Sequence, residues 1–167
     1  MNITPYLLNC FLLLLPIFIW NIIFARSLPD KYTDRGNWDN IPKLLAAAEN
    51  TLRTIVFLLP AVMKLTLTNA QAIVGLIIYL IGIIVYFASW TMQIKFPEHS
   101  WSKSLLGSMA PAYTSLLLFL GIGLIGKESF LNIPKISLFY IILSIVFVVI
   151  HSVHAYLVYI QSYKREK

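Results

Sequence analysis

The chain has 167 residues, of which 59% are hydrophobic and only 12% charged, and its mean hydropathy is +0.78. Soluble domains are about half apolar and about a quarter charged, so this composition excludes an ordinary soluble fold and predicts a polytopic membrane protein. The net charge of +6 comes from basic residues near the ends of apolar runs, so no nucleic-acid partner is expected. The apolar runs lack a strict period of two, which predicts helices rather than a closed barrel.

The first apolar segment covers about residues 5–25. No Lys or Arg precedes it, it is longer than the apolar region of a signal peptide, and no small-x-small motif closes it, so a retained first helix is expected. The segment contains Cys10, the only cysteine of the chain, which excludes an intrachain disulfide and a cysteine-based zinc site. Cys10 is expected to be a small packing residue.

A polar loop, RSLPDKYTDRGNWDN, follows the first segment. Its acids Asp30 and Asp34 alternate with basic residues, and their spacing, with Asp39, matches no calcium loop or phosphate-binding motif. The loop is either a solvated interfacial segment or a cap over a polar cleft.

The second apolar segment, about 41–67, contains Glu49, Asn50 and Arg53 within the stretch LLAAAENTLRTIVFLLPAVMK. A continuous helix over 41–67 would be about 40 Å long, against a hydrocarbon core of about 30 Å. Counting back about 20 residues from Leu67 places Glu49 at the membrane boundary and Arg53 about 6 Å deeper. Glu49 and Arg53 are four residues apart and can form an ion pair. The pair is either a structural couple that reaches the headgroups or one wall of a cleft.

The third and fourth segments, about 72–94 and 104–125, carry small residues at helical spacing. In the third segment the small and polar residues follow a 3.5-residue repeat, which predicts a seam for close helix packing or, as the alternative, one wall of a ligand pocket. These residues are Gly75, Tyr79, Gly82, Tyr86, Ser89 and Gln93. The fourth segment opens with small residues and contains Pro111, which predicts close packing and a backbone carbonyl free of its helical partner.

The fifth segment, about 136–160, places Tyr140, His151 and His154 on one helical face. A His-x-x-His pair can bind a metal only with two further ligands, and Glu49 is the only acid at a comparable depth. No metal and no cofactor is therefore expected. The histidines are either packed and hydrogen-bonded or part of a proton or ligand site.

The charge pattern predicts the orientation of these segments. Nine Lys and Arg residues lie in the first loop, the third loop and the C-terminal tail, whereas three lie on the other side. Because basic residues favour the cytoplasm, this predicts an all-α integral membrane protein with five transmembrane helices, the N-terminus outside and the C-terminus cytoplasmic. Trp20 and Trp90, near cytoplasmic helix ends, are expected at the headgroups. Residues 1–167 are predicted to form a single multi-pass domain in a cell membrane.

The ionisable residues of the second and fifth segments are all expected near the cytoplasmic side, where they can line one cavity. The candidate ligand-binding residues are Glu49, Asn50, Arg53, Tyr140, His151 and His154. No Walker motif and no Gly-x-Ser-x-Gly elbow is present.

Three functions therefore remain open. The first is the binding or transport of a small amphiphile or ion, and the second is a structural or regulatory subunit that packs against partner helices. The third is an enzyme that acts on lipid headgroups with a histidine as general base. The expected partners are membrane lipids, with a small ligand, a second copy of the chain or a partner subunit as alternatives.

Overall fold

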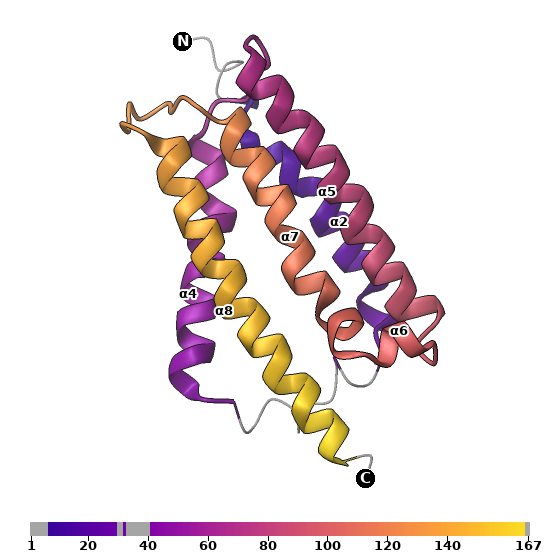
Figure 1. Ribbon diagram of the computed structural model, residues 1–167. Helices are drawn as coiled ribbons and strands as arrows, with labels where there is room; N and C mark the ends of the chain where they lie inside the picture. The colour runs from indigo at the N-terminus through magenta and orange to yellow at the C-terminus, as the bar shows by residue number, and fades with distance from the viewer. Residues whose placement is uncertain (1–6, 30–31, 33–40, 166–167) are drawn as a thin grey trace.

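The computed structural model describes residues 7–29, 32 and 41–165, and these residues form a helical bundle (Figure 1). Four helices in this part of the chain are long and apolar enough to cross a membrane, namely Lys43–Val62, Ala70–Lys95, Leu105–Ile125 and Ile136–Lys164. A shorter apolar helix, Cys10–Phe24, packs against them. The predicted all-helical fold is therefore confirmed for the described residues, and four of their helices have the length and apolar composition that a membrane span requires.

The last three predicted segments form helices close to their expected bounds. The helices are α5 (Ala70–Lys95), α6 (Ser100–Lys103), α7 (Leu105–Ile125) and α8 (Ile136–Arg165). Two of their starts are capped by side chains, since Asn69 accepts from the Ala72 N–H at 2.9 Å and Ser104 accepts from the Gly107 N–H at 3.1 Å. Helix α8 continues past the predicted end at residue 160.

The second segment forms α4 (Lys43–Leu58), which one 3-10 turn, η4 (Leu59–Val62), extends. The continuous helix predicted over 41–67 is wrong at its C-terminal end, because the helix stops at Val62. Pro60 has no N–H to donate within the helix, and Met63 has extended backbone with φ −91° and ψ 127°.

The first segment is also shorter than predicted over the described residues. It consists of a 3-10 helix η1 (Cys10–Leu14), α2 (Leu15–Phe24) and a 3-10 turn η2 (Ala25–Ser27). Asn9 caps its start by accepting from the Phe11 N–H at 3.1 Å. Pro16 cannot donate an α-helical hydrogen bond, which accounts for the 3-10 geometry that precedes it.

Backbone pairing ties the start of the first segment to the residues that follow the second. The Cys10 N–H donates to the Met63 carbonyl oxygen at 2.9 Å, so the residues before α2 run beside those after η4. The Lys64 N–H donates to the Glu128 carbonyl oxygen at 2.8 Å, which ties in the loop after α7. These bonds satisfy backbone N–H and C=O groups that have no partner within a helix at this end of the bundle.

Helix α7 lies between α5 and α8, and α4 packs against α8 (Figure 1). The six residues predicted as a packing seam on α5 are all buried. A Cβ added at Gly82 would lie 2.8 Å from the Leu118 nitrogen, and one at Gly121 would lie 2.6 Å from the Tyr79 Cβ. The two helices therefore meet at backbone contact, which confirms the seam. Because α7 covers it, the seam offers no docking face to a partner helix.

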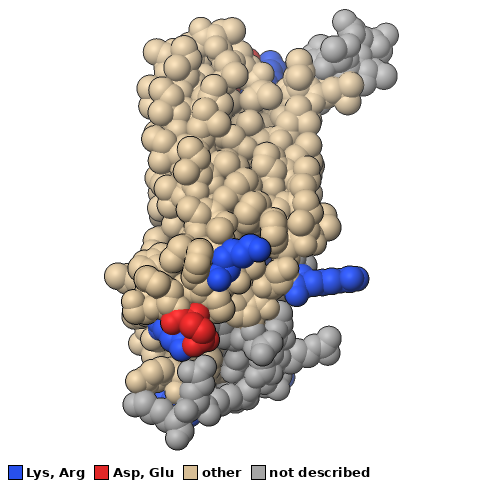
Figure 2. Space-filling view, turned by 90° about the vertical axis from the view of Figure 1, so that its right-hand side faces the viewer, with Lys and Arg blue, Asp and Glu red and all other residues tan. Residues whose placement is uncertain are grey.

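The outer surface of the bundle is largely apolar, with exposed Ile, Leu, Val and Phe side chains on the spanning helices. Figure 2 shows the side that α5 and α6 cover, where a broad band without charged side chains separates the charged groups of the two ends. An apolar band between charged ends is expected for a lipid-facing surface.

Gly82→Val is expected to destabilise the bundle by about 1–3 kcal/mol, because the new side chain would meet the backbone of Leu118. Ala88 lies on the same helix and is exposed, so Ala88→Val is a matched control with an expected effect within about 0.5 kcal/mol. Detergent-solubilised variants can be heated with a fluorogenic maleimide, since Cys10 is fully buried until the fold opens. Equal unfolding midpoints for the two variants would contradict the close contact.

Candidate functional site

A buried carboxylate lies at the centre of the candidate site. Glu49, on α4, exposes only 2% of its side chain. Arg53 and the His151 Nδ1 donate to its Oε1, the latter at 2.9 Å, and the His154 Nδ1 donates to its Oε2. An ionised carboxylate only accepts hydrogen bonds, so each imidazole carries a proton on Nδ1. We call these four residues the Glu49 cluster.

Helical spacing places the four side chains together. Glu49 and Arg53 are four residues apart on α4, His151 and His154 are three apart on α8, and the two helices pack against each other. The His151 ring also stacks on Phe147, with 5.5 Å between ring centroids and 7° between planes. Exposure rises from 8% for His154 to 33% for His151 and 45% for Arg53. Arg53 and His151 therefore face open space.

The helix end from which the depth of Glu49 is counted differs from the expected one. The helix Lys43–Val62 has 20 residues, which is the length needed to cross the hydrocarbon core. On this register Glu49 is about 9 Å and Arg53 about 15 Å from the Lys43 end. The expectation that Glu49 marks the boundary depended on a helix that continued to Leu67, and the helix does not.

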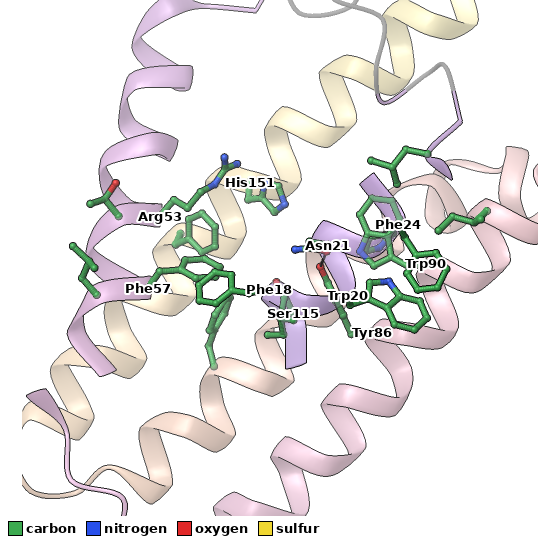
Figure 3. A pocket seen from close by; sticks show the side chains of 18 residues that line it. Phe18, Trp20, Asn21, Phe24, Arg53, Phe57, Tyr86, Trp90, Ser115 and His151 are labelled. Atoms are coloured by element: carbon green, nitrogen blue, oxygen red, sulfur yellow. Dashed lines mark hydrogen bonds between the residues drawn. The ribbon is translucent and has the colours of Figure 1, made fainter. Parts of the chain in front are cut away.

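A cavity of about 600 Å³ adjoins Arg53 and His151, and Figure 3 shows both side chains beside it. We call it the larger cavity, and all five apolar segments contribute to its wall. Its aromatic lining consists of Phe18, Trp20, Phe24, Phe57, Tyr86, Trp90, Phe119 and Phe147. Asn21, Thr54 and Ser115 add uncharged polar groups. An apolar cavity with a few polar groups is the usual form of a small-molecule site.

A second cavity, of about 210 Å³, also adjoins the cluster. Glu49 and His154 line this smaller cavity, together with Tyr32, Tyr159 and small polar residues of α7 and α8. Four residues line both cavities, namely Leu28, Trp90, Pro111 and His151. The two cavities therefore adjoin, and His151 belongs to both.

Two tyrosines close the smaller cavity by hydrogen bonds to backbone carbonyls. The Tyr32 hydroxyl donates to Ser108 at 2.8 Å, and the Tyr159 hydroxyl donates to Lys103 at 3.2 Å. Burial raises the pKa of the Tyr32 phenol to about 12, although the hydrogen bond to Ser108 acts in the opposite direction. Tyr32 is therefore a neutral donor at physiological pH.

Two of the six predicted ligand-binding residues lie apart from the cluster. Asn50 is exposed, and its backbone oxygen accepts from the Thr54 hydroxyl at 2.9 Å. Tyr140 is fully buried in the hydrophobic core. Neither side chain lines either of the two cavities. The structure thus brings together four of the six, and their ligand-binding role stays a prediction.

Other polar residues predicted near the cleft do not join the cluster. His99 is exposed, and its ring accepts from the Trp101 N–H at 3.2 Å to cap α6. Asp30, Asp34 and Asp39 lie outside the described residues, so the cap assigned to their loop is untested.

Most of the cavity wall was not foreseen from the sequence. Trp20 and Trp90, for which the sequence suggested only a headgroup position, line the larger cavity. The rings of Phe18 and Phe119 lie 5.3 Å and 5.6 Å from that of Phe57, between centroids. These phenylalanines come from different helices, so the spacing of residues within one helix cannot predict that they meet. The sequence shows only that aromatic residues occur in every apolar segment.

The arrangement can bind a polar head and exchange protons. The bond to Glu49 uses one of the five N–H donors of the Arg53 guanidinium, so further donors can reach a ligand in the larger cavity. Each imidazole donates through Nδ1 and can take a proton on Nε2. Among residues 7–29, 32 and 41–165, no group of three or more His, Cys, Asp or Glu side chains is arranged to hold a metal ion.

Comparison of the chain with models of known protein families, with curated proteins and with solved structures finds no match. The assignment of a function therefore depends on the geometry of the Glu49 cluster and its two cavities.

Proposed function

We propose that this protein binds, and by binding transports, a small amphiphile within the membrane. The polar head of the ligand contacts Arg53 and His151, and its apolar part lies among the aromatic rings of the larger cavity. The observation that carries the proposal is the composition of that wall, in which eight aromatic side chains and five other apolar residues surround a few polar groups, with Arg53 and His151 among the lining residues. Its volume of about 600 Å³ lies within the range of about 300–1,000 Å³ typical of small-molecule sites.

We also propose five membrane crossings in a cell membrane, with the N-terminus outside. The first segment supports this count because it runs alongside α5 in the same direction: Tyr79 donates to the Leu13 carbonyl at 2.8 Å, and Tyr86 donates to Asn21 at 3.2 Å. With 3-10 and α-helical rises, Cys10–Phe24 covers about 25 Å, close to the core thickness. The excess of nine basic residues over three supports the orientation.

Catalysis on a lipid headgroup is the second candidate. The Nδ1 of His151 donates to Glu49 while the ring lines both cavities, and a carboxylate that orients an imidazole in this way is typical of a general base. In that case His151→Ala abolishes turnover of a lipid substrate. The binding proposal differs because it predicts a saturable ligand that is recovered unchanged.

Arg53→Ala is expected to weaken the binding of 11-bromoundecanoate by about tenfold or more, because a charge-assisted hydrogen bond contributes about 1.5–3 kcal/mol. The bromine quenches tryptophan fluorescence at short range, and Trp20 and Trp90 line the cavity. A background with Trp38→Phe and Trp101→Phe removes the other two tryptophans. The measurement is saturable quenching in detergent, reversed by undecanoate without bromine.

Lys103→Ala is the matched control for a lost positive charge, since Lys103 is 58% exposed and pairs with Glu98 away from the larger cavity. It is expected to leave the affinity unchanged. Quenching that rises linearly with probe concentration and is equal in Arg53→Ala would reject the proposed site.

A further inference from the structure

We infer that the ligand of the larger cavity carries an anionic head and that one proton enters the Glu49 cluster with it. This inference depends on the proposed binding function and names the chemistry of the ligand. It comes from the charges of the cluster, from its burial and from the position of His151 between the two cavities.

The charges of the cluster cancel when both imidazoles are neutral. Glu49 contributes one negative charge and Arg53 one positive charge, and both imidazoles donate through Nδ1 to the same carboxylate. With neutral imidazoles the net charge is zero. A proton added to the Nε2 of either imidazole is stabilised by the carboxylate on the opposite side of the ring and raises the net charge to +1.

Burial makes a net charge costly at this place. Glu49 is 2% exposed and His154 is 8% exposed, and each lies inside its own helix of membrane-spanning length, α4 with η4 for Glu49 and α8 for His154. Uncompensated charge inside a membrane-spanning segment is strongly disfavoured. An anion alone would leave the loaded site at −1, whereas an anion with one proton leaves it at zero. A cationic head would leave it at +1, with no proton on Nε2 to release.

The two cavities separate the routes of the anion and the proton. Arg53 lines the larger cavity, whereas Glu49 and His154 line the smaller one. His151 lines both, so its ring can accept a proton that reaches the smaller cavity while it faces a ligand in the larger one. The smaller cavity also contains Tyr159, whose hydroxyl bonds to Lys103 at the basic end of the bundle.

Few other titratable groups can account for a proton taken up here. Among the described residues that line the two cavities, the titratable or charged side chains beyond the Glu49 cluster are Tyr32, Tyr86 and Tyr159. Phenols are neutral at physiological pH and have no proton to gain. The residues contributed by α2 and α7 to the cavity walls are uncharged. Proton uptake therefore reports on the Glu49 cluster, and replacing the two histidines separates their contribution from that of Glu49.

Three probes with the same chain and different heads test the inference: 11-bromoundecyl sulfate, 11-bromoundecan-1-ol and (11-bromoundecyl)trimethylammonium. The sulfate cannot be protonated, so any proton taken up resides on the protein. Binding is followed by quenching of Trp20 and Trp90 as above, and proton uptake by a pH indicator in weakly buffered detergent solution. The sulfate is expected to bind with uptake of about one proton. Its affinity is expected to fall as the pH rises, by about tenfold for each pH unit where binding must bring the proton in from solution.

The alcohol is expected to bind with no proton uptake and no dependence on pH, and the ammonium probe is expected not to bind. His151→Gln with His154→Gln should abolish proton uptake, whereas His99→Gln, on the exposed cap of α6, should leave it unchanged. Sulfate binding without proton uptake in the unmodified protein, or preferential binding of the ammonium probe, overturns the inference and leaves the amphiphile site in place. Failure of all three probes to bind instead rejects the proposed function.

Discussion

Glu49→Ala is expected to lower the free energy of unfolding by about 3–5 kcal/mol, a loss typical of a buried charge network that loses one partner. The substitution removes the acceptor of Arg53 and of both histidines at once. His154 is 8% exposed, so water cannot readily replace the carboxylate at its Nδ1. Denaturation by SDS, followed by maleimide labelling of buried Cys10, measures the change.

The chain provides matched controls for this substitution. Glu98 pairs with Lys103 and Glu128 pairs with Lys64, and these carboxylates are 83% and 66% exposed. Exposed ion pairs contribute about 1 kcal/mol or less, so Glu98→Ala and Glu128→Ala are expected to change stability little. If all three variants unfold at the same SDS concentration, Glu49 is not the buried centre of a network.

The sequence predicted the helices whose bounds depend on local information. The start of α7 has Ser104 as a cap, and Asn69 precedes α5, so side-chain chemistry within one turn determines where these helices begin. The end of η4 and the start of η1 also involve a backbone bond between Cys10 and Met63, which are far apart in the chain. Hydropathy cannot reveal such pairing, because Cys10 and Met63 are as apolar as the residues of a spanning helix.

The sequence predicted the residue pairs of the Glu49 cluster but not the residues that line the cavities beside it. Spacings of four and three residues predicted that Glu49 with Arg53, and His151 with His154, share helical faces, and the scarcity of ionisable residues predicted that the two faces meet. The aromatic wall depends on rings from several helices, so only tertiary packing brings it together. The depth expected for Glu49 was counted from Leu67, whereas the helix ends at Val62, so the length of the helix could not be read from hydropathy alone.

Replacing the whole cluster by apolar residues is expected to restore most of the stability that Glu49→Ala removes. The combined variant is Glu49→Met, Arg53→Met, His151→Phe and His154→Leu. Buried ion networks are often no more stabilising than well-packed apolar side chains of similar volume, because desolvation of the charges offsets their attraction. The variant should therefore unfold within about 1–2 kcal/mol of the unmodified protein in the same SDS assay.

The same variant is expected to lose binding of 11-bromoundecyl sulfate by about a hundredfold or more, since both the guanidinium and the proton site are absent. Recovery of stability without recovery of binding would mean that the charges serve the ligand rather than the fold. A combined variant as unstable as Glu49→Ala would contradict this view. The network would then be an architectural element that joins α4 to α8, and the cavity beside it would need a different account.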